Sequence, residues 1–394
     1  MTPPHQRIAY LEGPGDIVAA FEAWRTGVRF QSETSVTFSS QFFDFAKSIG
    51  ADTFCSSYCL RSDSALSPGF QVCNSPRPDV GHWHVNRVLN IYFVIKLAAQ
   101  FWRQRRRVVY VAWGPEDLIF LCIFRLFGLS VVSILHNALW PHGKRPAGVR
   151  SSLRLIKQRW ALRGFVSHVM VVSPVIAEQV RELAPTLAAR ISVFAPKFYP
   201  QDFDFSVTAP QQRDPPRKLL FVGRLEKDKG VFFALDALSL LEERCPGLFH
   251  LTYCGSGSAS ESLERRVIES ALPQAVTLRG RLDKTELIAA YRACDIVLVP
   301  TTSGFAEGFG MVVAEAILCG KPVVCTSVVP SAQPCAAAAL IVAPDDANAI
   351  ADAVLLLATD SALYRGKLDG CIALRANLLD SDASFGAKLG NVAI

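Results

Sequence analysis

Charged side chains are scarce in this sequence. They make up 19% of its 394 residues, whereas hydrophobic residues make up 50%. This balance is typical of parallel β-sheets whose strands are buried on both faces, and it also suits a surface that stays apolar against a bilayer. A chain of this length exceeds the size at which a single core usually divides, so two domains are expected.

Several signals of other protein classes are missing. The eleven cysteines are odd in number and contain no CxxC pair, so we expect reduced, mostly buried thiols in the cytosol, with no disulfide framework or thiolate metal site. The first residues lack the apolar core of a signal peptide. The most apolar stretch, residues 118–135, is interrupted by Arg125 and by Gly-Leu-Ser at 128–130, which predicts helix, turn and strand and no transmembrane span.

Positive charge is concentrated in one part of the chain. Residues 81–165 hold fourteen basic and two acidic residues, a local charge of +12 within a net charge of +6, so the remainder carries −6. The basic segments 103–107 and 145–163 predict contact with an anionic leaflet, at roughly 1 kcal/mol per basic residue near the surface, with a solvated basic face as the alternative. Nucleic acid is not expected, because no recognition motif is present. We therefore expect a cytoplasmic protein, peripheral on the inner face of the membrane.

Strand and helix patterns alternate along both halves of the chain, which predicts two Rossmann-like, doubly wound parallel sheets of an α/β protein with a cleft between them. The predicted strands are 7–12, 108–113, 130–135, 168–172, 219–222, 250–254, 276–279, 296–300, 322–325 and 340–343. The predicted helices are 17–24, 118–127, 150–163, 175–183, 231–243, 260–270, 284–292, 311–318 and 346–357. Residues 55–80, rich in Ser, Pro and Asp, are expected to form a loop.

A proline-rich segment marks the expected boundary between the domains. We expect a first domain at 1–200, a linker at 201–217 and a second domain at 218–375. The last residues, 376–394, are expected to pack back on the first domain. Ligands of such folds bind at the carboxyl ends of the strands.

One carboxylate stands in an otherwise apolar helix. Glu315 has only apolar neighbours within a turn on each side, and such a group is costly to bury without hydroxyls or a cation. Ribose hydroxyls would satisfy it; an internal salt bridge or an exposed Glu is the alternative. The preceding Glu307-Gly308-Phe309-Gly310 offers a sugar-binding carboxylate, glycines for close approach and helix-start amides for phosphate.

Two cations follow the first strand of the second half. Arg224 and Lys229 lie in Gly-Arg-Leu-Glu-Lys-Asp-Lys-Gly at 223–230, on the expected loop between strand and helix. A planar guanidinium and a compact ammonium together can neutralise a diphosphate leaving group. The alternative, a solvated loop charge, suits Lys227 better than Arg224. Gly255 and Gly257 could be mistaken for a dinucleotide fingerprint, but position 260 is Ser and the pair follows the second strand, so a tight turn is expected.

These segments occur in a familiar order. The 223–230 loop, the strand ends at 254–257, 276–280 and 295–300, and the Glu307 to Glu315 segment resemble the C-terminal domain of retaining family-4 glycosyltransferases of the GT-B fold, over residues 217–360. The resemblance implies that Glu307 contacts the donor sugar, Glu315 the ribose, and Arg224 and Lys229 the diphosphate. It also implies that the backbone near Gly280, Leu282 and Asp283 contacts the nucleotide base. The amides of Gly308, Phe309 and Gly310 would face the sugar and phosphate.

The first half resembles the family less closely. His136 occupies the place of the family's histidine near the reacting sugar, although a structural role is the alternative, and Gly13 and Gly15 match its glycine loop. Residues 194–200 depart from the family's Asn-Gly-Val-Asp type segment, and the loop 300–307 is longer than usual.

The resemblance implies retaining transfer from a nucleotide-diphosphate sugar to a glycan or lipid-linked acceptor, in surface polysaccharide or glycolipid synthesis. No cofactor or metal is expected, because cationic side chains take the metal's place and no DxD pair lies at a suitable strand end. A phosphorylase or epimerase of the same fold, or a non-catalytic nucleotide-sugar-binding protein, is the alternative. A nicotinamide-dependent oxidoreductase is not expected, because neither half carries GxGxxG on its first strand.

Overall fold

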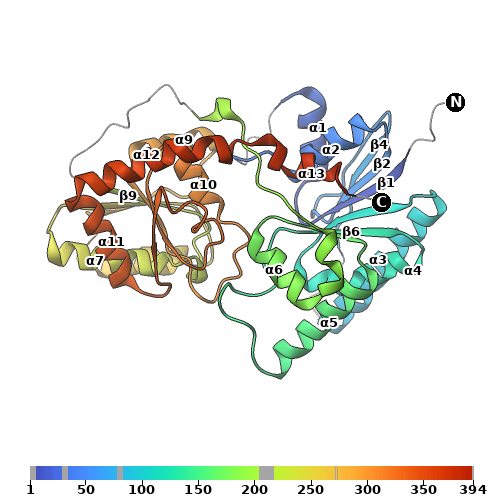
Figure 1. The fold of residues 1–394 in the computed structure, drawn as a ribbon, viewed down its shortest axis with the longest axis horizontal. Coiled ribbons are helices and arrows are strands. Elements are labelled where there is room, and N and C mark those ends of the chain that lie inside the picture. The colour runs from blue at the N-terminus through green and yellow to red at the C-terminus, as the bar shows by residue number, and fades with distance from the viewer. Residues whose placement is uncertain are drawn as a thin grey trace.

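The computed structural model describes residues 6–28, 34–77, 83–203, 217–270, 272 and 274–392. Most of the expected linker, residues 204–216, lies outside this range. Two α/β units lie side by side, each built on its own sheet (Figure 1). The expected pair of doubly wound domains is thereby confirmed. Among the described residues, no helix is both long enough and apolar enough to cross a membrane.

Within the described residues, the first sheet has eight strands in the order β3-β4-β2-β1-β5-β6-β7-β8, of which only β3 and β4 pair antiparallel. Its strands are β1 (Arg7–Glu12), β2 (Asp52–Ser57), β3 (Ser64–Ser67), β4 (Phe70–Asn74), β5 (Val108–Ala112), β6 (Ser130–Leu135), β7 (His168–Val171) and β8 (Ile191–Val193). Its helices and 3₁₀ turns are α1 (Ile17–Thr26), α2 (Phe38–Ser48), α3 (Trp83–Arg103), η1 (Pro115–Phe120), α4 (Leu121–Leu126), α5 (Val149–Phe165), α6 (Pro174–Leu183), η2 (Pro185–Arg190) and η3 (Pro200–Asp202).

The second sheet has six parallel strands in the order β11-β10-β9-β12-β13-β14. They are β9 (Lys218–Val222), β10 (His250–Cys254), β11 (Val276–Leu278), β12 (Ile296–Val299), β13 (Val323–Thr326) and β14 (Ala339–Val342). The helical elements are η4 (Lys227–Lys229), α7 (Val231–Arg244), α8 (Ser260–Glu269), α9 (Lys284–Ala293), α10 (Met311–Leu318), α11 (Ala347–Thr359), α12 (Ser361–Leu378), η5 (Ser381–Ala383) and α13 (Phe385–Leu389).

The burial of the central strands on both faces explains why their sequences are almost entirely apolar. Every residue of β5, β12 and β13 is buried, as expected where helices cover both faces of a parallel sheet. Helix starts also follow the sequence, since the Asp16 carboxylate caps α1 by accepting the Ala19 N–H at 2.9 Å. In the same way, the Asp346 carboxylate caps α11 by accepting the Ala349 N–H.

The expected loop at 55–80 is wrong, because this segment holds the end of β2 and all of β3 and β4. The Ser and Pro residues that indicated a loop flank short strands at the sheet edge. β4 alternates buried and exposed residues, with Phe70 and Val72 inside and Gln71 outside. Such a short alternating run gives a weaker signal than the fully apolar central strands.

The chain returns to the first domain after α12, where α13 packs against α2 (Figure 1). The Phe385 ring lies edge-on to Phe38 and Phe194, with ring centres 5.4 and 5.2 Å apart. The Gly386 N–H donates to the Gln41 side chain at 3.1 Å. The domains are therefore joined by this segment as well as by the connection after β8.

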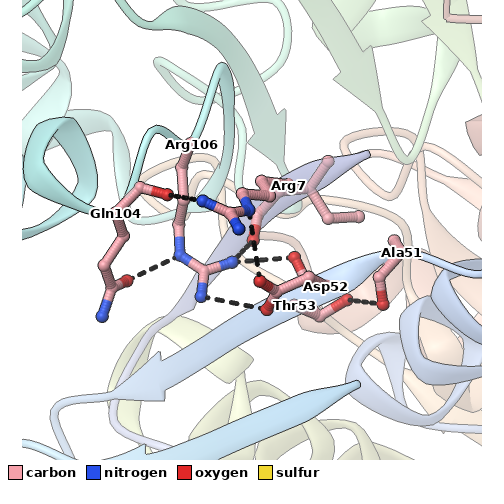
Figure 2. Close-up of polar contacts among 7 residues, drawn as sticks. Arg7, Ala51, Asp52, Thr53, Gln104 and Arg106 are labelled. Carbon is pink, nitrogen blue, oxygen red and sulfur yellow. Dashed lines mark hydrogen bonds and ion pairs between the residues drawn. The ribbon is translucent and has the colours of Figure 1, made fainter. Parts of the chain in front are cut away.

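One residue of the basic segment 103–107 is structural. Arg106 is 7% exposed and donates to the backbone carbonyls of Ile8 and Asp52, at 2.7 and 2.8 Å, and to the Gln104 side chain at 2.8 Å. Figure 2 shows this guanidinium joining β1, β2 and the turn before β5. Its predicted contact with a membrane is therefore wrong, because its side chain ties together the amino ends of β1 and β2.

Candidate functional site

Three glycine turns meet at the carboxyl edge of the second sheet. Gly223, Gly255 and Gly280 have φ of +141°, +145° and +66°, and they follow β9, β10 and β11. Gly255 donates its N–H to the Gly280 carbonyl at 2.7 Å, and a Cβ on Gly255 would overlap the Gly223 carbonyl. A Cβ on Gly257 would likewise overlap the backbone of Leu225. These glycines serve close packing between loops, in agreement with the tight turn expected there.

Arg224 and Lys229 of the 223–230 loop both lie near one aromatic ring. Lys229 Nζ lies 4.1 Å from the centre of the Phe305 ring, and the Arg224 guanidinium lies 5.9 Å from it. The Thr302 N–H donates to the Asp228 carbonyl at 2.9 Å, which ties this loop to the segment after β12. The long 300–307 loop thus positions both cations.

Lys229 and Glu307 form an ion pair with a 2.6 Å Nζ–Oε2 distance. Their side chains are only 19% and 14% exposed. The group expected to bind phosphate and the group expected to bind sugar hydroxyls therefore meet in one place. They satisfy each other in this structure.

Glu315 is buried in α10, 6% exposed, and its carboxylate accepts two hydroxyl hydrogen bonds. Tyr291 of α9 donates to Oε2 at 2.6 Å, and Thr34 of the first domain donates to Oε1. Burial raises the pKa of Glu315, although both hydrogen bonds act to lower it. Within the described residues no cation pairs with it, so the internal salt bridge weighed above is not formed there. Because Thr34 lies across the domain boundary, Oε1 points toward the first domain.

The turn before α10 faces the first domain closely. A Cβ on Gly308 would overlap the His136 carbonyl, and Phe309 packs against the first domain's core. Gly310 has φ of +92° and lies where a Cβ would collide with Val329. The close approach predicted for these glycines is thus to protein backbone and side chains in this structure. Their amides remain predicted ligands of sugar and phosphate.

His136 and Glu307 line one cavity between the domains. Its volume is about 270 Å³, and its other lining residues are Ser35, Val36, Thr37, Phe38, Asn137, Val172, Pro196, Phe309, Gly310 and Met311. Burial lowers the pKa of His136, so the imidazole is neutral at neutral pH. Its Nδ1 is buried without a hydrogen-bond partner in the described part of the chain.

The remaining predicted residues lie at strand ends outside the lining of this cavity. Gly13 follows β1 and accepts the Tyr58 N–H at 3.2 Å, while Gly15 lies near the Glu12 carboxylate. Leu282 packs into the second domain's core. Asp283 caps α9, and its own N–H donates to Glu286 at 3.1 Å, so that amide is already occupied.

Sequence reasoning missed three residues of this site. Thr34 and Tyr291 hold Glu315, and Phe305 lies beside both cations. Thr34 is 281 positions from Glu315 in sequence, so no local pattern signals the contact. Tyr291 could have been suspected, because a tyrosine buried in a helix usually gives its hydroxyl a partner.

The architecture is that of a GT-B protein, as expected. Anabaena HepE, solved in complex with UDP, aligns with a TM-score of 0.68 at 16% identity over 98% of both chains. Sucrose-phosphate synthase from Thermosynechococcus elongatus aligns with a TM-score of 0.70 at 20% identity, also over 98% of both. At these identities the likeness establishes the fold.

Residues 216–360 match the model of the family described as glycosyl transferases group 1. The match covers the region of the resemblance found in the sequence and confirms its similarity to this group of glycosyltransferases. A D-inositol 3-phosphate glycosyltransferase from Pseudarthrobacter chlorophenolicus is 38% identical over 28% of this chain and 26% of its own. A glycogen synthase from Mycobacterium tuberculosis is 28% identical over 53% of this chain and 49% of its own. The chain thus spans about a quarter to a half of these relatives.

Proposed function

We propose that this protein transfers a sugar, with retention of anomeric configuration, from a nucleotide-diphosphate sugar to a glycan or lipid-linked acceptor. The observation that carries the proposal is the Lys229–Glu307 pair, with Arg224 beside it, at the domain boundary where Glu307 shares a cavity with His136. A carboxylate for sugar hydroxyls and two cations for a diphosphate are what this reaction requires. The family of the second domain supports the same chemistry.

The residues suggest how each charge would be handled. The donor's diphosphate would take Lys229 from Glu307, and Glu307 would then accept hydrogen bonds from the sugar. As the anomeric carbon–oxygen bond breaks, Arg224, Lys229 and the amides at the start of α10 stabilise the departing diphosphate. The acceptor hydroxyl attacks the oxocarbenium-like carbon from the same face and gives its proton to the leaving phosphate oxygen. In this proposal the side-chain cations do the work of a metal.

The direct test replaces each cation and leaves the loop intact. Arg224→Gln and Lys229→Gln should each lower turnover by roughly a hundredfold, the usual effect of losing one preorganised donor to a developing charge. Lys227→Gln is the matched control, since Lys227 is an exposed lysine of the same loop. Nucleotide release with membrane-extracted acceptor measures the rate, and NMR of the product reports the anomer. Wild-type turnover in both cation variants would refute the assignment, and an inverted product would refute retention.

The membrane contact proposed for the first domain is supported by exposed apolar side chains among its basic residues. Val88, Tyr92 and Trp102 of α3 are 66%, 66% and 63% exposed. Ile156 and Trp160 of α5 are 60% and 53% exposed. α4 packs between these two helices, and Figure 1 places α3, α4 and α5 together at one end of the first domain. Aliphatic and aromatic side chains flanked by Arg and Lys are typical of surfaces that rest on an anionic leaflet.

A further inference from the structure

A second hollow lies in the first domain, between α3, η1 and α5. It has a volume of about 700 Å³, and we call it the α3–α5 groove. η1 follows β5 almost directly, and β5 lies between β1 and β6 in the sheet. The groove therefore begins at the sheet edge that also carries Gly13 and His136.

Stacked side chains connect the α3–α5 groove with the loop after β1. Asp117, which lines the groove, pairs with Arg77 at 2.8 Å. The Arg77 guanidinium lies 4.1 Å from the centre of the Tyr58 ring and 4.6 Å from that of Trp113. Tyr58 in turn donates its N–H to Gly13. The groove is thus linked through Asp117, Arg77 and Tyr58 to the glycine loop after β1.

Three polar atoms of the groove are buried and have no hydrogen-bond partner among the described residues: Asn90 Oδ1, Arg154 Nε and Gln158 Oε1. Gln158 is only 3% exposed, and its amide nitrogen donates to the Pro115 carbonyl at 3.3 Å, which leaves its oxygen as an acceptor without a donor among the described residues. An unpaired buried polar atom costs about 1–3 kcal/mol. Amide oxygens accept only, so a ligand with hydroxyl donors fits them.

The charge of the groove points to an anion. Its two acids are already paired, Glu116 with Arg154 and Asp117 with Arg77. Arg150 and Lys157 line the groove with no ion pair in the part of the chain that the structure describes. Arg150 also lies in the first turn of α5, which contains no acidic residue. A cation is unfavourable at that end of a helix dipole, and a bound anion would offset it.

Apolar side chains border these cations. Leu153 lines the groove and is 52% exposed, Ile156 follows it on α5, and Val88 lies on the facing helix α3. Val88 and Ile156 belong to the surface proposed to rest on the membrane. An amphiphile could therefore place its head in the groove while its chain stays in the bilayer.

We propose that the α3–α5 groove binds the phosphorylated, hydroxyl-rich head group of a lipid-anchored acceptor. Arg150 and Lys157 bind the phosphate, and Asn90 and Gln158 accept hydrogen bonds from the hydroxyls. This inference rests on the proposed glycosyl transfer, because it assigns a place to that reaction's acceptor.

The test compares two anionic lipids of equal charge in phosphatidylcholine vesicles. Phosphatidylinositol offers a phosphate and ring hydroxyls, whereas phosphatidylmethanol offers the phosphate alone. Co-sedimentation should show the wild-type protein binding phosphatidylinositol vesicles about tenfold more tightly, the value of roughly one net hydrogen bond. Arg150→Gln with Lys157→Gln should weaken binding to both vesicles and bring the ratio close to one. Asn90→Ala should weaken binding to phosphatidylinositol alone.

Arg159→Gln with Arg163→Gln is the matched control. It removes the same charge from the exposed face of α5, outside the groove lining, and should weaken both vesicles alike while the tenfold ratio persists. The proposed head-group site would be refuted if the wild-type protein bound phosphatidylinositol and phosphatidylmethanol vesicles with nearly equal affinity. It would also be refuted if both double variants lost the preference for phosphatidylinositol to the same extent. Soluble inositol 1-phosphate, but not inorganic phosphate, should compete if the whole head group is recognised; competition by both alike would overturn it as well.

Thermal shifts with UDP, ADP and GDP separate this inference from the proposed function. Nucleotide binding should persist in every groove variant. A protein that prefers phosphatidylinositol but binds no nucleotide would contradict the transferase and support the groove as a lipid site. A protein that binds nucleotide but shows no preference for phosphatidylinositol would contradict only the proposed lipid site in the groove.

Discussion

The contact between Thr34 and Glu315 predicts that removing a hydroxyl improves nucleotide binding. If a ribose takes the Oε1 side of the Glu315 carboxylate, the Thr34 hydroxyl that now donates there must first leave. Thr34→Val keeps the side-chain shape and removes only this donor. A hydrogen bond to a charged group contributes about 1.5–3 kcal/mol. The dissociation constant for nucleotide should therefore fall by roughly 10- to 100-fold.

The same change should destabilise the unliganded protein, because one carboxylate oxygen is left buried without a donor. Calorimetric titration with the nucleotide that gives the largest thermal shift measures the affinity, and a melting curve without nucleotide measures the stability. Tyr291→Phe is the control: it also removes one hydroxyl from Glu315, but from within the second domain. We expect it to lower stability without improving affinity.

Two results would refute this reasoning. Unchanged or weaker nucleotide binding in Thr34→Val would mean that the nucleotide does not displace Thr34 from Glu315. Equal improvement in Thr34→Val and Tyr291→Phe would mean that general loosening around α10, and no exchange of hydroxyls, sets the affinity.

Three further predictions concern charge. The pKa of Glu315 is raised by burial, so its ionisation lowers the stability of the fold as pH rises from the ordinary glutamate range through the folded-state pKa. Glu315→Gln should therefore raise the melting temperature at neutral pH and make it depend less on pH. The same change should weaken nucleotide binding. Arg106→Met should destabilise the first domain by about 1–3 kcal/mol, measured by urea denaturation, because it removes the side-chain donor to the carbonyls of Ile8 and Asp52. Arg105→Met, at the neighbouring position, is its comparison. Because the pKa of His136 is lowered, the transfer rate should stay constant from neutral pH down to about 6.5, the ordinary histidine value, and a decline beginning above that value would contradict a neutral imidazole.

The sequence predicted best what a single strand or loop determines. The strands around Val109, Val297 and Val324 are buried throughout and almost entirely apolar because helices cover both faces, so both sheets could be expected. The turn at Gly255 could be expected because glycine allows its positive φ and the contact with Gly223. In contrast, β3 and β4 alternate only in burial, over four and five positions, and their sequences show no clear apolar–polar alternation beside their Ser and Pro neighbours.

The candidate site was predictable in its residue types and not in its pairings. Glu307, Glu315, Arg224 and Lys229 lie in segments with recognisable spacing. Which groups they contact depends on how the two domains meet, and a single sequence does not encode that in any local pattern. The pairing of Lys229 with Glu307 and the contribution of Thr34 come from that tertiary arrangement.

These pairings share a physical cause. Charged groups are costly to bury without partners. The Lys229 ammonium and the carboxylates of Glu307 and Glu315 are all partly or fully buried, so each finds its hydrogen-bond or ion-pair partners within the protein. Lys229 uses Glu307, and Glu315 uses Thr34 and Tyr291. The cavity left between the domains, about 270 Å³, is below the roughly 300–1,000 Å³ of clefts that hold drug-sized ligands. In the proposed reaction, donor binding is therefore an exchange, in which the nucleotide sugar replaces the protein groups that now hold Lys229, Glu307 and Glu315. The affinity for the nucleotide sugar then reflects the free-energy difference between the unliganded protein, whose groups are paired internally, and the complex, whose groups are paired with the ligand. The loss of one competing hydroxyl, that of Thr34, should therefore strengthen binding.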